Sequence, residues 1–580
     1  MRAPDEDVLR VGNCSGFYGD RLSAMREMLE GGELDVLTGD WLAELTMLIL
    51  GRDRLGDPDT GYAKTFLLQL RECLGLALEQ GVTIVANAGG VNTPGLVTAI
   101  RELAQQQGLS PRIAHVRGDD LTPRATELGL GHPMGAHAYL GGFGIARAVD
   151  SGADIVVTGR VTDASVIVGP AIAHFGWGRA DLDALAGATA AGHVIECGTQ
   201  ATGGNYAFFT EIDDLTHPGF PIAQIHRDGA SVITKHPGTG GAVTVDTVKS
   251  QLLYEIADAR YPGPDVTTRL DTITLQQEGV DRVLMSGVRG EAPPPELKVS
   301  LTSLGGFRNE MTMVLTGLDI EAKAELVQRQ FEAGLTTSPA ELTWTLARTD
   351  DPDAPTQQQA AALLTVVARD TDPKVVGRAF SRAGIEIALG TYPGCHTLAP
   401  PSAGSPYGVF TPGYVPQSVP DHEVVLDDGV VEAVTPPQET RELEALTGEP
   451  TAAHVEATGD AAPTTTVPLG TIAGARSGDK GGHANVGVWV RDEATWPWLS
   501  ALLTPERIRQ LLPEAADLPV TVTHLPNLRA VNIVIENLLG QGVADNVRFD
   551  PQAKGLGEWL RSRHVDIPLN LLPATPKDER

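Results

Sequence analysis

The sequence has few of the features that mark small stapled or membrane-spanning proteins. Only four cysteines occur in 580 residues. They lie far apart without a CxxC pair, which argues against a disulfide framework or a structural zinc site and fits a reducing cytosol. The most apolar runs, such as 45–50 and 83–88, are far shorter than a bilayer span. The amino terminus, MRAPDEDVLR, has three carboxylates and no apolar stretch, so we expect no secretory signal. These absences predict a cytoplasmic protein without membrane contact.

Positive charge is also scarce. The chain has 44 lysines and arginines against 74 aspartates and glutamates, a formal net charge of −30. Nucleic-acid phosphates would be repelled over most of such a surface, so we expect no nucleic-acid partner. Walker A, GxGxxG, HExxH and GxSxG motifs are missing, which argues against nucleotide binding, zinc peptidase and serine hydrolase chemistry. We expect a small anionic substrate, held by a few local arginines or backbone N–H groups.

Short β-branched runs alternate with helical stretches over the first two hundred residues. The runs lie at 8–11, 34–40, 82–88, 112–118 and 152–158. Because they do not alternate polar with apolar residues, they are typical of parallel strands buried on both faces. The fold class expected for 1–203 is therefore α/β, a parallel sheet with one site at its strand ends.

The character changes after residue 203. Residues 204–435 are expected to form an α+β part. Its order after Met311 is β-α-β-β-α-β, typical of a ferredoxin-like layer, with helices at 320–333 and 373–383 and a last strand at 385–392. Residues 436–468 are rich in Pro, Thr, Ala and Glu and predict a linker. Residues 469–580 are expected to form a small C-terminal α+β domain.

Polar and glycine residues recur where the expected strands end. They are Asn13, Ser15 and Gly16, then Asp40, then Asn87, Gly89, Gly90 and Asn92, then Arg117, and finally Arg160 and Asp163. Ligands bind outside the carboxyl ends of strands in open parallel sheets. Asp and Asn also cap helices, so one such residue alone would be ordinary. Their recurrence at one edge predicts a single polar site.

These residues suggest roles in proton transfer at a carbon next to a carbonyl. Asp163 or Asp40 would move the proton, and Asn87 with the amides of Gly89 and Gly90 would hold the developing enolate oxygen. Glu196, beside an apolar run, is a second acid–base candidate. Anion-binding candidates are Asn13, Ser15, Gly16, Asn92, Arg117, Arg160, Lys235, His236, Gly240, Arg476 and Lys480. No metal ligand set is predicted.

Several motifs resemble the acyclic terpene utilisation family AtuA. They are GNCSGFYGD, LTGDWLAELT, NAGGVN, TGRVTDASVIVGP, ECGTQATGGN and TKHPGTGGAVTVDTV, while GARSGDKGGHANVGVWV and LPNLRAVNIVIEN resemble its ferredoxin-fold C-terminal domain. Cys14 departs from the small polar residue or glycine expected there. The resemblance implies a place in citronellol and geraniol catabolism, among enzymes of branched acyl-CoA thioesters. It supplies no catalytic residues.

The leading hypothesis is an enzyme, most simply a hydratase or other lyase acting on an acyl-CoA or related carboxylate. One alternative is acyl transfer or thioester hydrolysis through Cys197, which would need a lowered thiol pKa. Another is a non-catalytic scaffold subunit of an acyl-CoA-processing complex. No cofactor is predicted beyond CoA as part of the substrate, and a divalent ion joining Asp40 and Asp163 stays open. The size of the chain favours a homo-oligomer.

Overall fold

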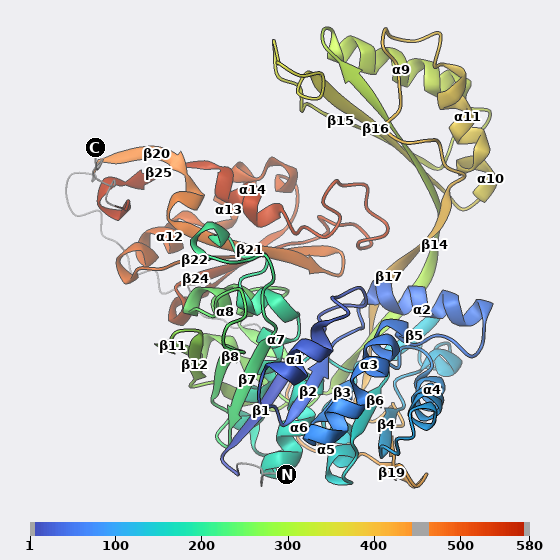
Figure 1. The fold of residues 1–580 in the computed structure, drawn as a ribbon. Helices are drawn as coiled ribbons and strands as arrows, with labels where there is room; N and C mark the ends of the chain where they lie inside the picture. Colours follow the sequence, from blue (N-terminus) through green and yellow to red (C-terminus); the bar gives the residue numbers. More distant parts are fainter. Residues whose placement is uncertain (1–5, 444–462, 574–580) are drawn as a thin grey trace. The chain divides into compact units, whose positions relative to one another are not determined.

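The computed structural model describes residues 6–443 and 463–573. Its largest element is a mixed sheet in the order β11-β12-β8-β7-β1-β2-β3-β6-β4-β18-β19 (Figure 1). The strands are β1 Val8–Asn13, β2 Val36–Gly39, β3 Thr83–Ala86, β4 Ile113–Arg117, β6 Ile155–Thr158, β7 Pro221–His226, β8 Ser231–Lys235, β11 Thr274–Gly279, β12 Arg282–Ser286, β18 Glu423–Val425 and β19 Val431–Ala433. The central five, β1-β2-β3-β6-β4, pair in parallel and confirm the α/β prediction. Antiparallel strands extend the sheet on both sides.

The central strands are buried on both faces, as their continuous apolar runs predicted. Val11 and Val36 point into one core and Leu37 and Ile84 into the other, because successive side chains of a strand point to opposite faces. The core around Leu37 and Ile84 also includes residues of helices α1 Ala24–Gly31, α3 Lys64–Gln80 and α4 Thr93–Gln106. The core around Val11 and Val36 includes residues of helices α5 Phe143–Asp150, α6 Ser165–Phe175 and α7 Leu182–Ile195. Nearby elements are α2 Glu44–Gly56, α8 Val245–Leu252, β5 Gly135–Ala138, β9 Arg260–Pro262, β10 Thr267–Arg269 and β13 Arg289–Glu291.

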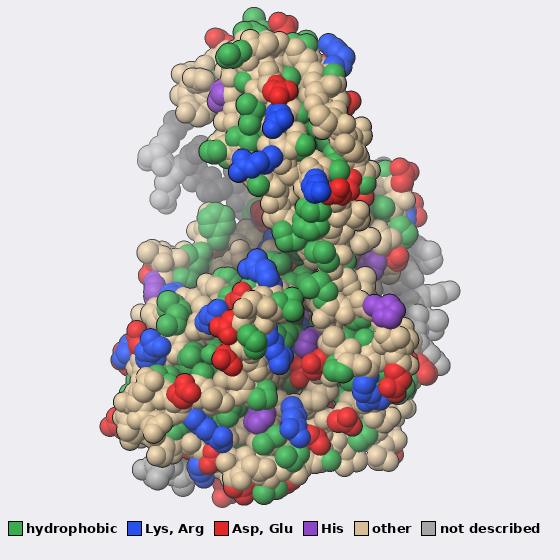
Figure 2. All heavy atoms as spheres, turned by 90° about the vertical axis from the view of Figure 1, so that its right-hand side faces the viewer, with side chains coloured by type: hydrophobic (Ala, Val, Ile, Leu, Met, Phe, Trp, Pro, Cys, Tyr) green, Lys and Arg blue, Asp and Glu red, His purple; other side chains and the backbone are tan. Residues whose placement is uncertain are grey.

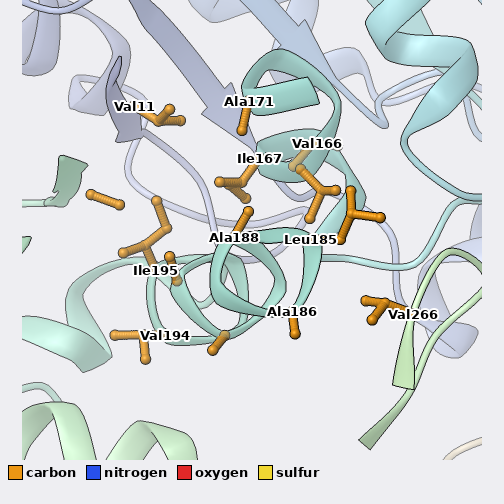
Figure 3. Close-up of a cluster of buried hydrophobic side chains, with 14 of the residues drawn as sticks. Val11, Val166, Ile167, Ala171, Leu185, Ala186, Ala188, Val194, Ile195 and Val266 are labelled. Carbon is orange, nitrogen blue, oxygen red and sulfur yellow. The ribbon is translucent and has the colours of Figure 1, made fainter. Parts of the chain in front are cut away.

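Helix α7 is buried almost all round, which is the position of an apolar helix inside a core. Figure 3 shows Leu185 and Ala188 of this helix near Ile167 of α6. Small residues allow α7 to pack closely on the start of α6: a Cβ on Gly192 would lie 2.8 Å from the Cβ of Ala164. The helix therefore has a fixed position, and it ends directly before Glu196.

Residues 303–409 and 544–551 form a compact unit of their own. Its sheet has the order β15-β16-β14-β17, with β14 Glu296–Thr316, β15 Glu341–Ala347, β16 Ala361–Asp370 and β17 Ser405–Pro416. The helices are α9 Ile320–Gly334, α10 Pro373–Val376 and α11 Arg378–Glu386. The expected β-α-β-β-α-β order is present, but the last strand is β17 and not 385–392. The alternating Ile385, Ile387 and Leu389 imitate a strand, yet α11, with Phe380 and Ala383 buried, includes Ile385 and ends at Glu386, and residues 387–390 form a turn.

The other unit contains the described residues of Met1–Thr302, Phe410–Val543 and Gln552–Arg580. Its C-terminal part has an antiparallel sheet β21-β22-β24-β23, made of β21 Ala473–Lys480, β22 His483–Val490, β23 Val520–Leu525 and β24 Ala530–Ile535. Helices α12 Trp496–Leu502, α13 Pro505–Leu511 and α14 Leu556–Ser562 accompany it. The expected linker, 436–468, lies partly outside the described residues. Its end, Thr464–Pro468, is a strand, β20, paired with β25 His564–Pro568.

The C-terminal part shares a hydrophobic core with the α/β part. Trp489 and Ala530 belong to the same buried cluster as Val11 and Val156. The ring of Trp489 stacks on Tyr206 with 6.5 Å between centroids. These contacts fix the β21–β22 hairpin against the α/β core.

Charges of both signs are interspersed on the face shown in Figure 2, without a large area of one sign. Within residues 6–443 and 463–573, no helix is both long and apolar enough to cross a membrane.

Candidate functional site

Asp40 and Asn87 meet at the carboxyl ends of two neighbouring parallel strands. Asp40 follows β2 and Asn87 follows β3. Asn87 Nδ2 donates to Asp40 Oδ1 at 2.5 Å, and its Oδ1 accepts from the Trp41 amide at 2.7 Å. Both residues are buried. The pairing of β2 with β3 thus holds the Asp40 carboxyl in one orientation.

Arg160 and Asp163 follow β6, the next strand of the sheet. Arg160 Nη1 donates to Asp163 Oδ1 at 2.5 Å, and the Arg160 amide donates to Asp119 Oδ2 at 2.8 Å. The guanidinium lies over the ring of Tyr139, 4.2 Å from its centroid. Its Nε is buried and makes no hydrogen bond within the described residues. Arg160 is therefore a fixed cation whose Nε donor has no partner in the described chain.

Glu196 enters the same region from the end of α7. His193 Nδ1 lies 3.1 Å from Glu196 Oε1, a distance set by their i,i+3 spacing. Asn13 Nδ2 donates to the Glu196 carbonyl at 3.0 Å and so ties this turn to the end of β1. Glu196 Oε2 and His193 Nε2 are buried without a hydrogen-bond partner in the described chain. We call Asp40, Asn87, Arg160, Asp163, His193 and Glu196 the strand-end cluster.

Burial controls the protonation of this cluster. It raises the pKa of the Asp40 and Glu196 carboxyls well above their ordinary range, and the charge of Asp163 adds to both shifts. Arg160 opposes the shifts without cancelling them. Burial also lowers the pKa of His193 to about 4. The cluster thus holds two carboxyls whose burial favours the protonated form and a neutral imidazole beside the Arg160–Asp163 ion pair.

A second layer of charged groups surrounds Tyr139. Its hydroxyl donates to Glu44 Oε1 at 2.8 Å, and Lys298 Nζ lies 3.5 Å from the same oxygen. Burial opposes ionisation of Glu44, but Lys298 and Arg160 outweigh it and lower the pKa of Glu44 to about 2. Sequence reasoning missed Tyr139, Glu44 and Lys298. Lys298 lies in β14, far along the chain from the other two. The strand pairing of β14 with β5 brings it beside Tyr139.

The β21–β22 hairpin adds Lys480 from the C-terminal domain. Lys480 Nζ donates to the Glu255 carbonyl at 2.8 Å and lies 5.6 Å from the centre of the Tyr261 ring. Its charge acts on both Glu196 and His193. Lys480 is therefore a sequence-predicted residue that the structure brings to the strand-end cluster, whereas Glu255 and Tyr261 were not anticipated.

Asn13, Ser15 and Gly16 support the cluster through the backbone. Asn13 Oδ1 accepts from the Ser15 amide at 2.7 Å, and the Ser15 carbonyl accepts from the Asp40 amide at 2.9 Å. A Cβ on Gly16 would lie 2.6 Å from the carbonyl carbon of Cys197. The glycine is needed for this close approach, so the loop holds the site's frame and is not shown to bind an anion.

The loop after β3, which contains Gly89 and Gly90, does not form the predicted oxyanion hole. The Gly89 amide donates to the Thr158 carbonyl at 2.9 Å and has no proton left for an enolate. Gly90 lies in the left-handed region at φ 54°, where it forms a turn against Gly61. Asn92 caps α4 by accepting from the Gly95 amide at 3.1 Å. The Gly89 amide and the Asn92 side chain are therefore occupied by turn and cap contacts.

The remaining predicted anion binders have partners away from the cluster. Arg117 is exposed and pairs with Glu423 at 2.7 Å. Lys235 pairs with Asp281 at 3.0 Å, and His236 Nε2 lies 2.9 Å from the Met28 carbonyl. The other two are structural: Gly240 accepts from the Gly219 amide, while Arg476 donates to Gln200 and stacks on Tyr254 at 4.2 Å.

Cys197 is next to Glu196 but is poorly suited to nucleophilic catalysis. Burial raises the pKa of its thiol well above the ordinary value, and the charges of Glu196 and Glu255 raise it further. A thiolate would need a cation or helix amino terminus beside it. The surroundings of Cys197 therefore keep the sulfur protonated.

Two further observations concern small ligands. Thr162, Ser165 and Tyr261 help to line a cavity of about 30 Å³, enough for a water molecule. Among residues 6–443 and 463–573, no three His, Cys, Asp or Glu side chains are grouped as metal ligands.

Comparison with known proteins gives two family matches. The model of the AtuA ferredoxin-like domain matches residues 467–566. No curated protein and no solved structure matches the chain. The model of the acyclic terpene utilisation family protein AtuA matches residues 9–426, most of the α/β part and the unit that follows it. Since this match covers more than half of the chain, the protein belongs to the acyclic terpene utilisation family AtuA.

Proposed function

We propose that this protein is a lyase of the hydratase type, which adds water to, or removes it from, a carboxylate or acyl thioester. The observation behind the proposal is the strand-end cluster, where two buried carboxyls with raised pKa values lie near a fixed arginine. A carboxylic acid that keeps its proton at neutral pH can donate it to a leaving hydroxyl. Concentrating such groups at a sheet edge has no use in a scaffold subunit.

Glu196 is the better proton donor of the two carboxyls. Its Oε1 faces His193, whereas its buried Oε2 has no partner in the described chain. An unsatisfied buried oxygen costs free energy on the order of 1–3 kcal/mol, which a substrate hydroxyl at this position would recover. Asp40 already accepts from Asn87 and serves as the second acid.

Arg160 supports an anionic or carbonyl group on the substrate. Its Nη1 is held by Asp163, while Nε has no partner in the described residues. A guanidinium fixed in this way presents N–H donors to a carboxylate or a polarised carbonyl without further reorganisation. Asp163 acts in this arrangement by orienting Arg160 and not by moving a proton.

The test uses the full chain and a panel of 2,3-enoyl-CoA thioesters, beginning with crotonyl-CoA and 3-methylcrotonyl-CoA. Hydration removes the conjugated double bond and is followed by the loss of its absorbance. Glu196→Gln should lower kcat about 100-fold or more, since general acids typically contribute factors of that size. Glu423→Gln, the same change at the surface pair with Arg117, is the control and should keep full activity.

Two results would contradict the proposal. One is the absence of both turnover and thermal stabilisation with every thioester and its free acid, since a bound ligand raises folded-state stability. The other is full activity of Glu196→Gln.

A further inference from the structure

Removal of water from a hydroxyacyl group needs a base as well as an acid. The strand-end cluster offers none that is suitable. Burial raises the pKa of Asp40 and Glu196 and so favours their protonated forms, Asp163 is bound to Arg160, and the pKa of about 4 makes His193 a weak base. The base must therefore come from another part of the fold.

Lys480 is placed at this cluster by a tight hairpin. In the β21–β22 pairing Lys480 faces His483, so the connecting loop is Gly481 and Gly482. Two-residue loops of this kind need a positive φ, and Gly481 has φ 63°. Lys480 is thus the last strand residue before the turn, and it reaches the carbonyl of Glu255.

The segment around Glu255, whose carbonyl accepts the hydrogen bond from Lys480, is held in an unusual conformation by the C-terminal domain. Glu255 has φ 57°, the left-handed region that side chains other than glycine rarely adopt. Its amide donates to Asn485 Oδ1 at 2.7 Å, and its carbonyl accepts from Lys480 Nζ at 2.8 Å. Two residues of one hairpin therefore fix both the segment and the amine.

The partner of Lys480 differs from those of the other shielded lysines. Lys235 lies 3.0 Å from Asp281, Lys249 lies 3.2 Å from Asp246, and Lys298 lies 3.5 Å from Glu44. Half-buried Lys480 has no carboxylate within 4.0 Å among the described residues, and its only hydrogen bond there goes to a neutral carbonyl. The amine of Lys480 therefore lacks the carboxylate that holds the positive charge on the other three lysines.

We infer that Lys480 is the base of the site: its Nζ takes the proton from the carbon next to the substrate carbonyl. The inference rests on the proposed hydratase function and deepens it. It makes the C-terminal domain part of the active site within the same chain. It also replaces the role expected from the sequence, in which Lys480 holds an anion.

The surrounding charges favour this role. Burial lowers the pKa of the Lys480 amine, and the positive charge of Lys298 lowers it further. Glu255, Glu44 and Asp163 act in the opposite direction without reversing the shift. On the other side, burial raises the pKa of Glu196 and lowers that of His193, which favours the neutral form of both groups.

The step is balanced without a cofactor. The lone pair of Lys480 Nζ forms a bond to the α-proton, and the electrons of the C–H bond form the double bond. The β C–O bond breaks, and the leaving hydroxyl takes the proton of Glu196 and departs as water. Return of the proton from Lys480 to Glu196 restores the starting state.

The first experiment needs no substrate. The full chain has nine lysines, so reductive methylation with ¹³C-formaldehyde gives a small set of methyl signals, and Lys480→Arg identifies that of Lys480. Following the signals against pH should show Lys480 losing its proton at a lower pH than Lys298, whose pKa is raised by Tyr139 and Glu44 against the effect of burial. Titration of Lys480 at or above Lys298 would overturn the inference, and so would complete protection of Lys480 in the folded protein, since a substrate must reach it.

The second experiment separates a base from an anion clamp. Arginine keeps a positive charge but cannot act as a base near neutral pH. With crotonyl-CoA, Lys480→Arg should lower kcat about 100-fold and leave KM nearly unchanged. Retained kcat would rule out the base and support a clamp. If no thioester is turned over, the proposed function fails, while the titration still decides whether Lys480 is a reactive amine.

Discussion

At the scale of single residues, protonation distinguishes this site from an ordinary polar surface. Glu196 and Glu44 are both glutamates near Arg160, yet their pKa values move in opposite directions. Burial is the largest influence on both carboxyls; it prevails for Glu196, whereas Lys298 and Arg160 together outweigh it for Glu44. Burial thus favours the protonated form of one glutamate, and neighbouring cations favour the ionised form of the other.

Glu196→Gln should stabilise the protein increasingly as the pH rises above 4.5, the ordinary value of this carboxyl. The folded chain holds the Glu196 proton more tightly than the unfolded chain, so wild-type stability is greatest below that value and falls as the pH approaches the folded pKa. The glutamine has no proton to lose. The free energies of unfolding of variant and wild type, measured from pH 4 to 8, should diverge above pH 4.5 by about 1.4 kcal/mol per pH unit until the folded pKa of Glu196 is reached.

Glu44→Gln provides the control with the opposite sign. The pKa of Glu44 is about 2 in the folded chain, so its contribution is present above 4.5 and is lost as the pH falls toward 2. The variant should be less stable than wild type at neutral pH, and the difference should shrink in acid. Parallel pH curves for the two variants would refute both assignments.

Cys197 should resist a thiol-directed reagent in the folded protein at neutral pH. Its raised pKa leaves almost no thiolate, the form that reacts. Peptide-level mass spectrometry after iodoacetamide treatment should show labelling of Cys197 only when the chain is denatured. Rapid labelling that substrate blocks would instead favour the acyl-transfer alternative.

At the scale of elements, the site depends on the contact between the loop after β1 and the end of α7. Gly16 lies against the backbone of Cys197, and Asn13 binds the Glu196 carbonyl. The contact of Gly16 with Cys197 is between two backbones and cannot adjust by a rotamer change. The position of the Glu196 carboxyl is therefore set by the loop as much as by its own helix.

Gly16→Ala should destabilise the protein by about 1–3 kcal/mol, the usual cost of forcing extra volume into a packed region. Its new methyl group would lie 2.6 Å from the Cys197 carbonyl carbon, so the turn holding Glu196 must move. Chemical denaturation measures the loss. Gly51→Ala in α2 is the matched control, because nothing lies within 4 Å of its Cβ position and alanine favours a helix by about 1 kcal/mol. Equal stability changes would show that the loop contact is unimportant.

At the scale of the whole molecule, the C-terminal domain belongs to the body that carries the site. Trp489 and Ala530 share a core with the α/β strands, while residues 303–409 form a separate unit with a core of their own. Two compact units with separate cores are expected to unfold separately, whereas domains that share a core unfold together.

Calorimetry should therefore resolve two unfolding transitions, and Arg476→Ala should lower only one of them. Arg476 stacks on Tyr254 and donates to Gln200, so its loss weakens the unit that contains the site by about 1–2 kcal/mol. Arg348→Ala, at an ion-paired surface position of the other unit, is the comparison. It should leave the transition of the unit that contains the site unchanged. A third transition for the C-terminal domain alone would disprove the shared core.

The sequence by itself determined the parallel strands, the edge at which Asp40, Asn87, Arg160 and Asp163 meet, and the candidacy of Glu196. These features follow from local information, because apolar runs predict buried strands and the residue after each strand must lie at the sheet edge. The same reasoning placed Arg117, Lys235 and Asn92 in the site, although Glu423, Asp281 and the cap of α4 occupy them.

Only the tertiary structure decided which groups surround that edge and which proton each one holds. Lys298 arrives through the pairing of β14 with β5, and Lys480 through the docking of a hairpin more than two hundred residues away from Glu255. Burial and neighbouring charges depend on such long-range contacts and not on residue type. The protonation of the cluster is therefore a property of the folded chain.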